Sequence, residues 1–197
     1  LENRRAQSTL LLEASLDDPE TPGRLVHRSV QRYGRLDALV NNASSFYPTP
    51  IGEATQAQWD ELFSSNARAP FFLAQAAAPH LRAARGAIVN LVDIYAERPL
   101  ARHTIYCMAK AANLMLVQSL ARELGPEVRV NGVAPGAVLW PEAGKSYADQ
   151  QELLGKSALR RAGAPEDVAG AVKFLLCDAP FVTGQILRVD GGRSLNM

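Results

Sequence analysis

The sequence predicts an α/β protein with a doubly wound, Rossmann-like parallel sheet. Short apolar runs of strand length alternate with longer segments of helical, amphipathic spacing along the whole chain of 197 residues. Such alternation is typical of repeated βαβ units, in which successive strands lie parallel. The length also favours one domain, so residues 1–197 are expected to form a single unit.

In the first half of the chain, two strands and two helices are expected. The first helix ends at Gly34, because glycine readily adopts the backbone conformation that ends helices. A loop rich in proline and serine, reaching to about Gly52, follows the second strand. The second helix is expected to bend near residues 66–70, where Pro70 cannot continue the helical hydrogen bonds. The predicted elements are a strand at 9–16, a helix at 20–33, a strand at 36–42 and a helix at 55–85.

The second half continues the alternation of strands and helices. Gly125-Pro126 is expected to end one long helix, and Pro165 to begin another, where its missing N–H is harmless. The last strand runs into Asp190-Gly191-Gly192. The predicted elements are strands at 87–92, 128–133 and 185–189, helices at 105–124 and 165–176, and an irregular region at 136–164 with a short helix near 149–154.

Composition and charge speak against two classes of function. Lys and Arg number 21 against 20 Asp and Glu, so no field that would attract a nucleic acid or a membrane surface is expected. The longest apolar stretch, at 70–79, contains Gln75 and is too short to span a bilayer. The two cysteines, Cys107 and Cys177, are expected to be free thiols in a reducing, cytoplasmic setting. No metal site is predicted.

Three residues in the middle of the chain point to acid–base chemistry. Tyr106 and Lys110 are four residues apart in a predicted helix, so both side chains project from one face. Asp93 ends the apolar strand before this helix. A phenol beside a fixed ammonium can have its pKa lowered toward neutrality, and a neighbouring carboxyl can feed or orient the proton. The same spacing also suits an aromatic rim residue beside a solvated charge, but asparagine-containing turns elsewhere favour the chemical interpretation.

These residues and three other motifs resemble the short-chain dehydrogenase/reductase family. The Tyr-x-x-x-Lys pair of the family matches Tyr106 and Lys110, and its Asn-Asn-Ala-Gly motif corresponds to Asn41-Asn42-Ala43-Ser44. The asparagine that kinks a helix in the family matches Asn66. The Pro-Gly turn that meets the nicotinamide end of the cofactor matches Pro135-Gly136. The resemblance implies an oxidoreductase with a nicotinamide cofactor.

Within the family, the chain is most similar to the pteridine reductases. The general family has serine at the position of Asp93, whereas pteridine reductases have aspartate there. They also share the stretch Asn42–Pro50, in which the phenylalanine, here Phe46, stacks on the pterin. This similarity implies NADPH-dependent reduction of a pterin of the dihydrobiopterin or dihydrofolate type by a homotetramer. NADPH is implied by the resemblance alone, since the residues that choose NADP over NAD lie in a segment without a counterpart here.

The resemblance also implies roles for individual residues. Tyr106 and Asp93 would supply the proton, and Lys110 would stabilise the phenolate and position the cofactor. Asn66 would hold a relay water on its backbone carbonyl, or simply bend its helix. Trp140 would wall the substrate pocket or merely anchor its loop. The expected substrate contacts are Phe46, Asp93, Tyr106 and Trp140, and the expected cofactor contacts are Asn42, Ala43, Ser44, Tyr106, Lys110, Pro135, Gly136 and Val138.

The sequence contains no glycine-rich turn of the kind that receives a dinucleotide pyrophosphate. Its start at Leu1 resembles the second helix of the family, so about 45 residues with the first two strands have no counterpart. In the family sheet order 3-2-1-4-5-6-7, this would leave a gap of roughly 14 Å between the strands at 9–16 and 36–42. A fragment that folds poorly and binds the cofactor weakly is therefore expected.

Two other interpretations stay open. One is a short-chain reductase of a carbonyl or 3-oxoacyl substrate, against which Asp93 and Phe46 speak. The other is a catalytically inactive fragment of such an enzyme, which the missing phosphate-binding turn supports.

Overall fold

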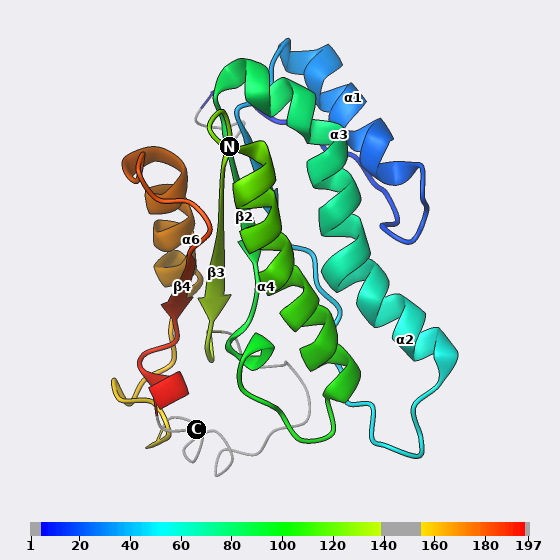
Figure 1. Cartoon of the computed structure of the whole chain (residues 1–197), viewed down its shortest axis with the longest axis vertical. Helices are drawn as coiled ribbons and strands as arrows, with labels where there is room; N and C mark the ends of the chain where they lie inside the picture. The colour runs from blue at the N-terminus through cyan, green and yellow to red at the C-terminus, as the bar shows by residue number, and fades with distance from the viewer. Residues whose placement is uncertain (1–4, 139–154, 196–197) are drawn as a thin grey trace.

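The protein is built on one parallel β-sheet, seen in the computed structural model of the chain (Figure 1). The structure describes residues 5–138 and 155–195. Within these ranges, four strands pair in the order β1-β2-β3-β4, all parallel. The predicted α/β class is therefore confirmed, as are the four strands predicted from residue 36 onward. They are β1 (Ala38–Asn41), β2 (Ala87–Leu91), β3 (Arg129–Pro135) and β4 (Ile186–Val189).

Helices connect and cover these strands, and local chemistry sets their ends. α1 ends where Gly34 adopts a φ of 76° and donates its N–H to the Val30 carbonyl at 2.8 Å. α2 begins at a capping box, in which Thr55 and Gln58 each accept the backbone N–H of the other. No helix in the described ranges is long and apolar enough to cross a membrane. The main helices are α1 (Thr21–Tyr33), α2 (Gln56–Phe63), α3 (Ala69–Ala84), α4 (Thr104–Leu124) and α6 (Pro165–Lys173).

Four shorter helical segments complete the described secondary structure. They are η1 (Ser64–Arg68), η2 (Ile94–Ala96), η3 (Phe174–Asp178) and η4 (Arg193–Leu195). The π-helical turn η1 divides the helix predicted at 55–85 into α2 and α3, so the predicted bend is confirmed. The helices predicted at 20–33 and 105–124 are confirmed as α1 and α4, and the one predicted at 165–176 continues past α6 as η3. The short helix predicted near 149–154 lies outside the described residues.

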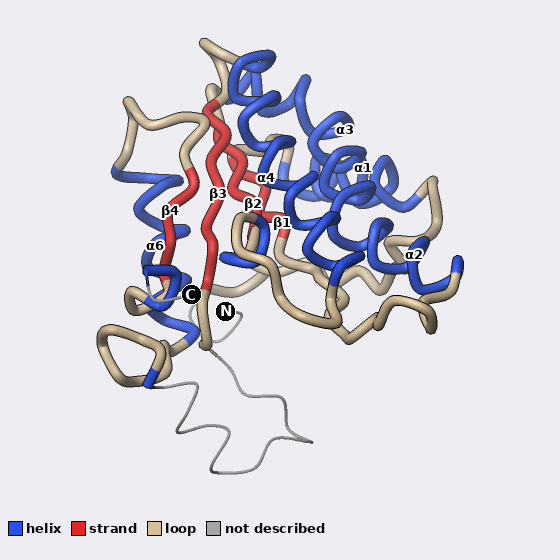
Figure 2. The backbone as a smooth tube through the Cα atoms, turned by 60° about the horizontal axis from the view of Figure 1, so that its bottom comes forward, coloured by secondary structure: helices blue, strands red, loops and turns tan. Residues whose placement is uncertain are grey.

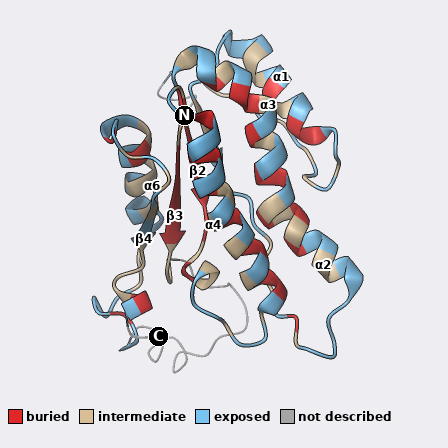
Figure 3. Ribbon diagram, viewed as in Figure 1, coloured by how far each residue is buried: buried red, intermediate tan, exposed pale blue. Residues whose placement is uncertain are grey.

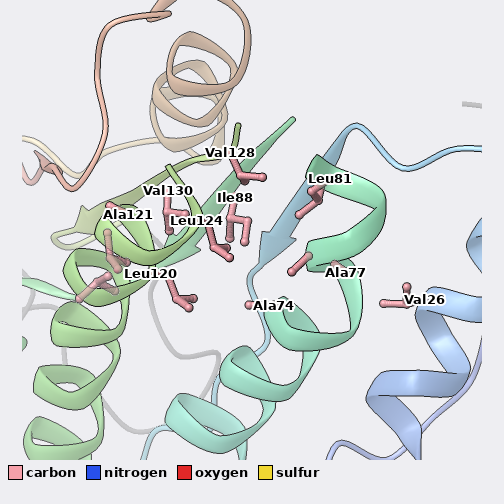
Figure 4. Packing of buried hydrophobic residues seen from close by; sticks show 13 residues of the cluster. Val26, Ala74, Ala77, Leu81, Ile88, Leu120, Ala121, Leu124, Val128 and Val130 are labelled. Carbon is pink, nitrogen blue, oxygen red and sulfur yellow. The ribbon is translucent and has the colours of Figure 1, made fainter. Parts of the chain in front are cut away.

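Side chains alternate along the buried strands, so each face of the sheet has its own core. Ile88 and Val130 pack with residues of α1, α3 and α4, as Figure 4 shows. Val89 and Val133 face the other way and pack with Leu175 of η3 and with α6. Figure 2 shows α6 on one side of the sheet and α1, α3 and α4 on the other. Buried residues line the central strands (Figure 3), as is typical of a parallel sheet covered on both faces.

The strand predicted at residues 9–16 is wrong. The segment keeps the alternation of a strand, with every second side chain partly buried, but it pairs with none of the described strands. Leu11 projects into solvent with 92% of its surface exposed. An extended segment becomes a β-strand only when a neighbour accepts its backbone hydrogen bonds. Among the described strands, β1 has β2 as its single neighbour, so its other edge carries no partner from residues 9–16.

Gly86 allows a close approach between the end of α3 and the segment that enters β1. Its N–H donates to the Leu81 carbonyl at 2.9 Å, and a Cβ at this position would overlap the backbone carbonyl of Asp37. We therefore expect Gly86→Ala to lower the free energy of unfolding by about 1–3 kcal/mol, because backbone has to move. Gly170 in α6 is a matched control, since a Cβ there meets nothing within 4 Å. Gly170→Ala should raise stability by about 0.5–1 kcal/mol, and urea unfolding of both variants checks the pair.

Candidate active site

Asp93, Tyr106 and Lys110 converge at the carboxyl end of β2. Asp93 follows this strand and caps η2, where its Oδ1 accepts the Tyr95 N–H at 2.9 Å. Tyr106, in the first turn of α4, donates its hydroxyl to Asp93 Oδ2 at 2.6 Å. Lys110 lies one turn further along α4 and donates to the Leu91 carbonyl at 3.0 Å, with its Nζ 5.7 Å from the centroid of the Tyr106 ring. The structure thus brings together the three side chains that the sequence singled out.

Burial dominates the electrostatics of this cluster. Tyr106 is 3% exposed and Lys110 2% exposed. Burial, and then repulsion from the Asp93 carboxylate, raises the pKa of Tyr106 far above its usual value. Burial also lowers the pKa of Lys110 to about 8, although the Asp93 carboxylate opposes this. The predicted lowering of the phenol pKa is therefore wrong here, because burial and then the adjacent Asp93 carboxylate both raise the pKa, while the ammonium bonds a carbonyl.

The pKa of Asp93 lies above the usual value for an aspartate. Burial raises the pKa of Asp93, and hydrogen bonds from Tyr106 and from the Tyr95 N–H offset part of this rise. The charges of Lys110 and Arg193 offset a further part. A carboxyl of this kind keeps its proton to a higher pH than an exposed aspartate, and it can donate that proton to a base.

Phe46 places an aromatic ring at the mouth of this cluster. The residue is 49% exposed, and its ring stands edge-to-face with that of Tyr106, with 4.8 Å between centroids and 74° between planes. It also stacks on His103, at 4.9 Å and 14°. His103 directly precedes α4 as its N-cap. This stacking was missed by the sequence analysis, because it joins the loop after β1 to the start of α4, two segments far apart in the sequence.

Asn66 and Ser44, predicted at separate places in the site, are directly bonded. The Ser44 hydroxyl donates to Asn66 Oδ1 at 2.7 Å. The Asn66 amide in turn donates to the Leu62 carbonyl at 2.9 Å and to the Ser45 carbonyl at 3.0 Å. Pro70 has no N–H to complete an α-helical bond to the Asn66 carbonyl, which is consistent with the π-helical turn at η1. Asn66 is fully buried and fixes the loop after β1 against the helix bend.

A chain of buried amides, which sequence reasoning missed, links two strands to α4. Asn41 donates to Asn90 at 2.8 Å, and Asn90 donates to Asn113 at 2.7 Å. All three side chains are at most 6% exposed. The chain ends on α4 three residues after Lys110, and Asn90 directly precedes the Leu91 carbonyl that holds Lys110. The signal was available, because Asn90 interrupts an apolar strand and Asn113 shares a helix face with Lys110.

The remaining predicted cofactor residues lie at the carboxyl ends of β1 and β3. Asn42 and Ala43 are exposed directly after β1. Pro135 ends β3, and Gly136 donates its N–H to the Val189 carbonyl at 3.0 Å. A Cβ at Gly136 would lie 2.8 Å from the Asp190 Cα, so this turn requires glycine. Val138 follows in the described part of the loop, whereas Trp140 lies outside the described residues. Parallel strands end at one edge of the sheet, so these residues share that edge with Asp93.

Comparisons with known proteins agree with this geometry. A family model of the short-chain dehydrogenases (adh_short_C2), described as enoyl-(acyl carrier protein) reductase, matches residues 2–194. The chain belongs to the short-chain dehydrogenase/reductase family. The structure of a blue fluorescent protein from a metagenomic library, in complex with NADPH, superposes on this short-chain dehydrogenase/reductase with a TM-score of 0.85. That protein is 35% identical, and the match covers 91% of this chain and 74% of that one.

Two relatives of this short-chain dehydrogenase/reductase differ in the substrates that their names give. A Streptomyces violaceoruber protein assigned as ketoacyl reductase 2 of the granaticin polyketide synthase is 37% identical, over 94% of this chain and 77% of that protein. Pteridine reductase 1 of Leishmania tarentolae is 39% identical, over 87% of this chain and 67% of that protein. The predicted family is therefore confirmed, while pteridine reductases are one of several similar groups within it.

Proposed function

We propose that this oxidoreductase reduces pterins with NADPH. The observation that carries the proposal is the hydrogen bond of 2.6 Å between Tyr106 and Asp93, placed beside the half-exposed ring of Phe46. A flat aromatic substrate fits beside such a ring by stacking. The ring nitrogens of a pterin also call for a stronger acid than the serine that the general family has at the position of Asp93. The 39% identity to a pteridine reductase supports the same substrate class.

The donor groups of the site fit the nicotinamide ribose of NADPH. Lys110 has three N–H donors, and the described residues give one acceptor for them, the Leu91 carbonyl. The Tyr106 ring lies beside this ammonium, and its hydroxyl oxygen can accept a hydrogen bond from a ribose hydroxyl while donating to Asp93. We propose that Asn42, Ala43 and Ser44 contact the cofactor after β1, and that Pro135, Gly136 and Val138 contact it after β3. A reduced nicotinamide bound there would supply hydride.

We propose that Asp93 and Tyr106 act as one donor pair. Burial raises the pKa of Asp93, so its carboxyl can hold the proton that a substrate nitrogen needs. Tyr106 fixes the direction of that carboxyl through the hydrogen bond that it donates. A proton can pass from Tyr106 to Asp93 along this bond if the Lys110 ammonium, which is the stronger acid, returns one to the phenolate. Lys110 supplies a buried positive charge that stabilises negative charge on either oxygen. The chain itself thus provides placement and proton transfer.

Two further assignments follow from the same proposal. Asn66, held by Ser44, would guide a relay water with its backbone carbonyl, and Trp140 would wall the substrate pocket together with Phe46. The homotetramer stays a prediction. The apolar side chains that such an assembly would bury are the exposed Phe71 and Phe72 of α3 and Met108 and Met115 of α4.

Reduction of a 3-oxoacyl substrate is the second candidate function. It is favoured by the 37% identity to the granaticin ketoacyl reductase. A carbonyl oxygen can be oriented by a weak hydroxyl donor, so this chemistry would have no special use for Asp93. Replacing Asp93 by serine therefore separates the two candidates.

Turnover of NADPH with dihydrobiopterin, dihydrofolate and an acetoacetyl thioester tests the proposal. We expect oxidation of NADPH with the two pterins, and a loss of about 100-fold or more in Asp93→Ser. Faster turnover of the thioester, retained in Asp93→Ser, would instead establish the 3-oxoacyl reductase. A titration of NADPH fluorescence against the chain tests the third interpretation. Failure to bind the cofactor would favour a catalytically inactive fragment.

A further inference from the structure

Arg193 approaches the candidate active site from the far end of the chain. It begins η4, directly after the turn Asp190-Gly191-Gly192 that follows β4. The Asp190 carboxylate fixes this turn by accepting the N–H of Gly192 at 2.9 Å and of Ser194 at 2.8 Å. Gly191 and Gly192 both adopt positive φ, 61° and 78°, which lets the chain reverse and point Arg193 inward. The direction of Arg193 is therefore set by a rigid turn.

The guanidinium of Arg193 is buried, and the described residues offer it few partners. Only 6% of the residue is exposed, and its Nη2 donates to the Tyr95 hydroxyl at 3.1 Å. Its Nε is buried and has no hydrogen-bond acceptor among the described residues. Burying an incompletely partnered charge is unfavourable. An arginine in this position therefore calls for a role that offsets the loss of stability.

Tyr95 connects this guanidinium to Asp93. The hydroxyl of Tyr95 receives Arg193, and its backbone N–H donates to Asp93 Oδ1 at 2.9 Å. Asp93 Oδ2 receives Tyr106. Both oxygens of the carboxyl are thus held, one by α4 and the other by the residue that Arg193 fixes. We propose that Arg193 is a positioning residue, which orients Asp93 through Tyr95 and acts on it as a buried positive charge.

This inference rests on the proposed function, in which Asp93 holds the proton. The groups that face Asp93 are Tyr106 and Lys110 from α4, Tyr95 from η2 and Arg193 from η4. Lys110 and Arg193 both pull the pKa of Asp93 down, against the effect of burial. Arg193 thus keeps the carboxyl from becoming too weak an acid to give up its proton near neutral pH.

Arg193 could instead serve only to tie the C-terminal turn to η2. In that case its removal would lower stability and leave the acidity of Asp93 unchanged. The two roles separate if the titration of Asp93 itself is followed, because a purely structural contact does not act on a distant proton.

Titration of the Asp93 carboxyl by 13C NMR, in the full chain, tests the proposal. The signal is assigned by its loss in Asp93→Asn. We expect Arg193→Met to raise the titration midpoint of Asp93 by about 0.5 pH unit, because a nearby positive charge is lost. Arg193→Lys should return the midpoint most of the way to that of the wild type. Tyr95→Phe, which keeps the charge but removes the hydroxyl that holds it, should raise the midpoint by a smaller amount.

Arg188→Met is the matched control. Arg188 lies on β4 and pairs with Glu97, so this variant removes a guanidinium from the same region without touching Tyr95. An unchanged Asp93 midpoint in Arg193→Met, or an equal rise in Arg188→Met, would overturn the proposal. If Arg193→Met does not fold, Tyr95→Phe and Arg193→Lys decide it.

The readout also separates this inference from the proposed function. A shifted midpoint in a chain that turns over no pterin would retain the role of Arg193 and reject the reductase. Pterin turnover could instead show the same pH profile in Arg193→Met and in the wild type, with an unmoved Asp93 midpoint. That result would retain the reductase and reject the role of Arg193.

Discussion

Replacing Tyr106 by phenylalanine is expected to lower kcat for pterin reduction by about 100-fold to 10,000-fold, the range typical of a lost proton donor. The variant keeps the ring that packs against Phe46 and loses only the hydroxyl bonded to Asp93. Stacking of the substrate should therefore persist, so the KM for the pterin should change much less than kcat. Steady-state kinetics at several pterin concentrations, with NADPH in excess, measure both values.

Tyr47→Phe is the control for this variant. The Tyr47 hydroxyl also donates to a carboxylate, that of Glu61, at 3.0 Å. Within the described part of the chain it makes no hydrogen bond to Asp93 or Lys110. Tyr47→Phe removes the same atom from the same residue type, but at a position in the loop after β1. We expect kcat within about twofold of the wild type, because the lost hydroxyl bonds Glu61 and not the reacting groups. Retention of more than about a tenth of the activity in Tyr106→Phe would contradict the donor-pair mechanism.

The sequence predicts most of the sheet because apolar periodicity reports burial directly. β2 is buried at every residue, and its run of apolar residues stands out for that reason. The segment at 9–16 shows what the same signal leaves out. Its alternation is real and survives in the structure as alternating exposure, yet a strand also needs a pairing partner. Periodicity within one segment carries no information about which other segment lies beside it.

The site divides along similar lines. The spacing of Tyr106 and Lys110 on one helix places both groups without any knowledge of tertiary structure. Their pKa values could not be read from that spacing, because the decisive cause is burial, which depends on how α4 packs against the sheet. Arg193 was missed for another reason. It is 98 residues from Tyr95 in the chain, and nothing in its local sequence separates it from a solvated arginine.

Pterin reduction is expected to fall as pH rises through about 8, because this is where the Lys110 ammonium loses its proton. Burial disfavours the charged amine, and the remaining attraction to Asp93 does not restore its usual pKa. If the ammonium is required, log kcat/KM should fall with a slope approaching one per pH unit above that value. Lys110→Met should lower kcat/KM by about 100-fold at pH 7, and this descending limb should be absent from its profile. Rate measurements from pH 6 to pH 10 check both expectations.

Stability should move in the opposite direction over the same range. The unfolded chain binds the lysine proton with the ordinary pKa of 10.5, whereas the folded chain releases it at about 8. Between these values the unfolded state holds more protons, so this group makes the free energy of unfolding rise with pH. The rise is on the order of 3 kcal/mol in total, and Lys110→Met should lack it. Urea unfolding of both proteins at pH 7 and pH 10 measures the difference. An activity that falls in parallel with stability would mean that the alkaline limb reports unfolding, and the ammonium would then have no part in the rate.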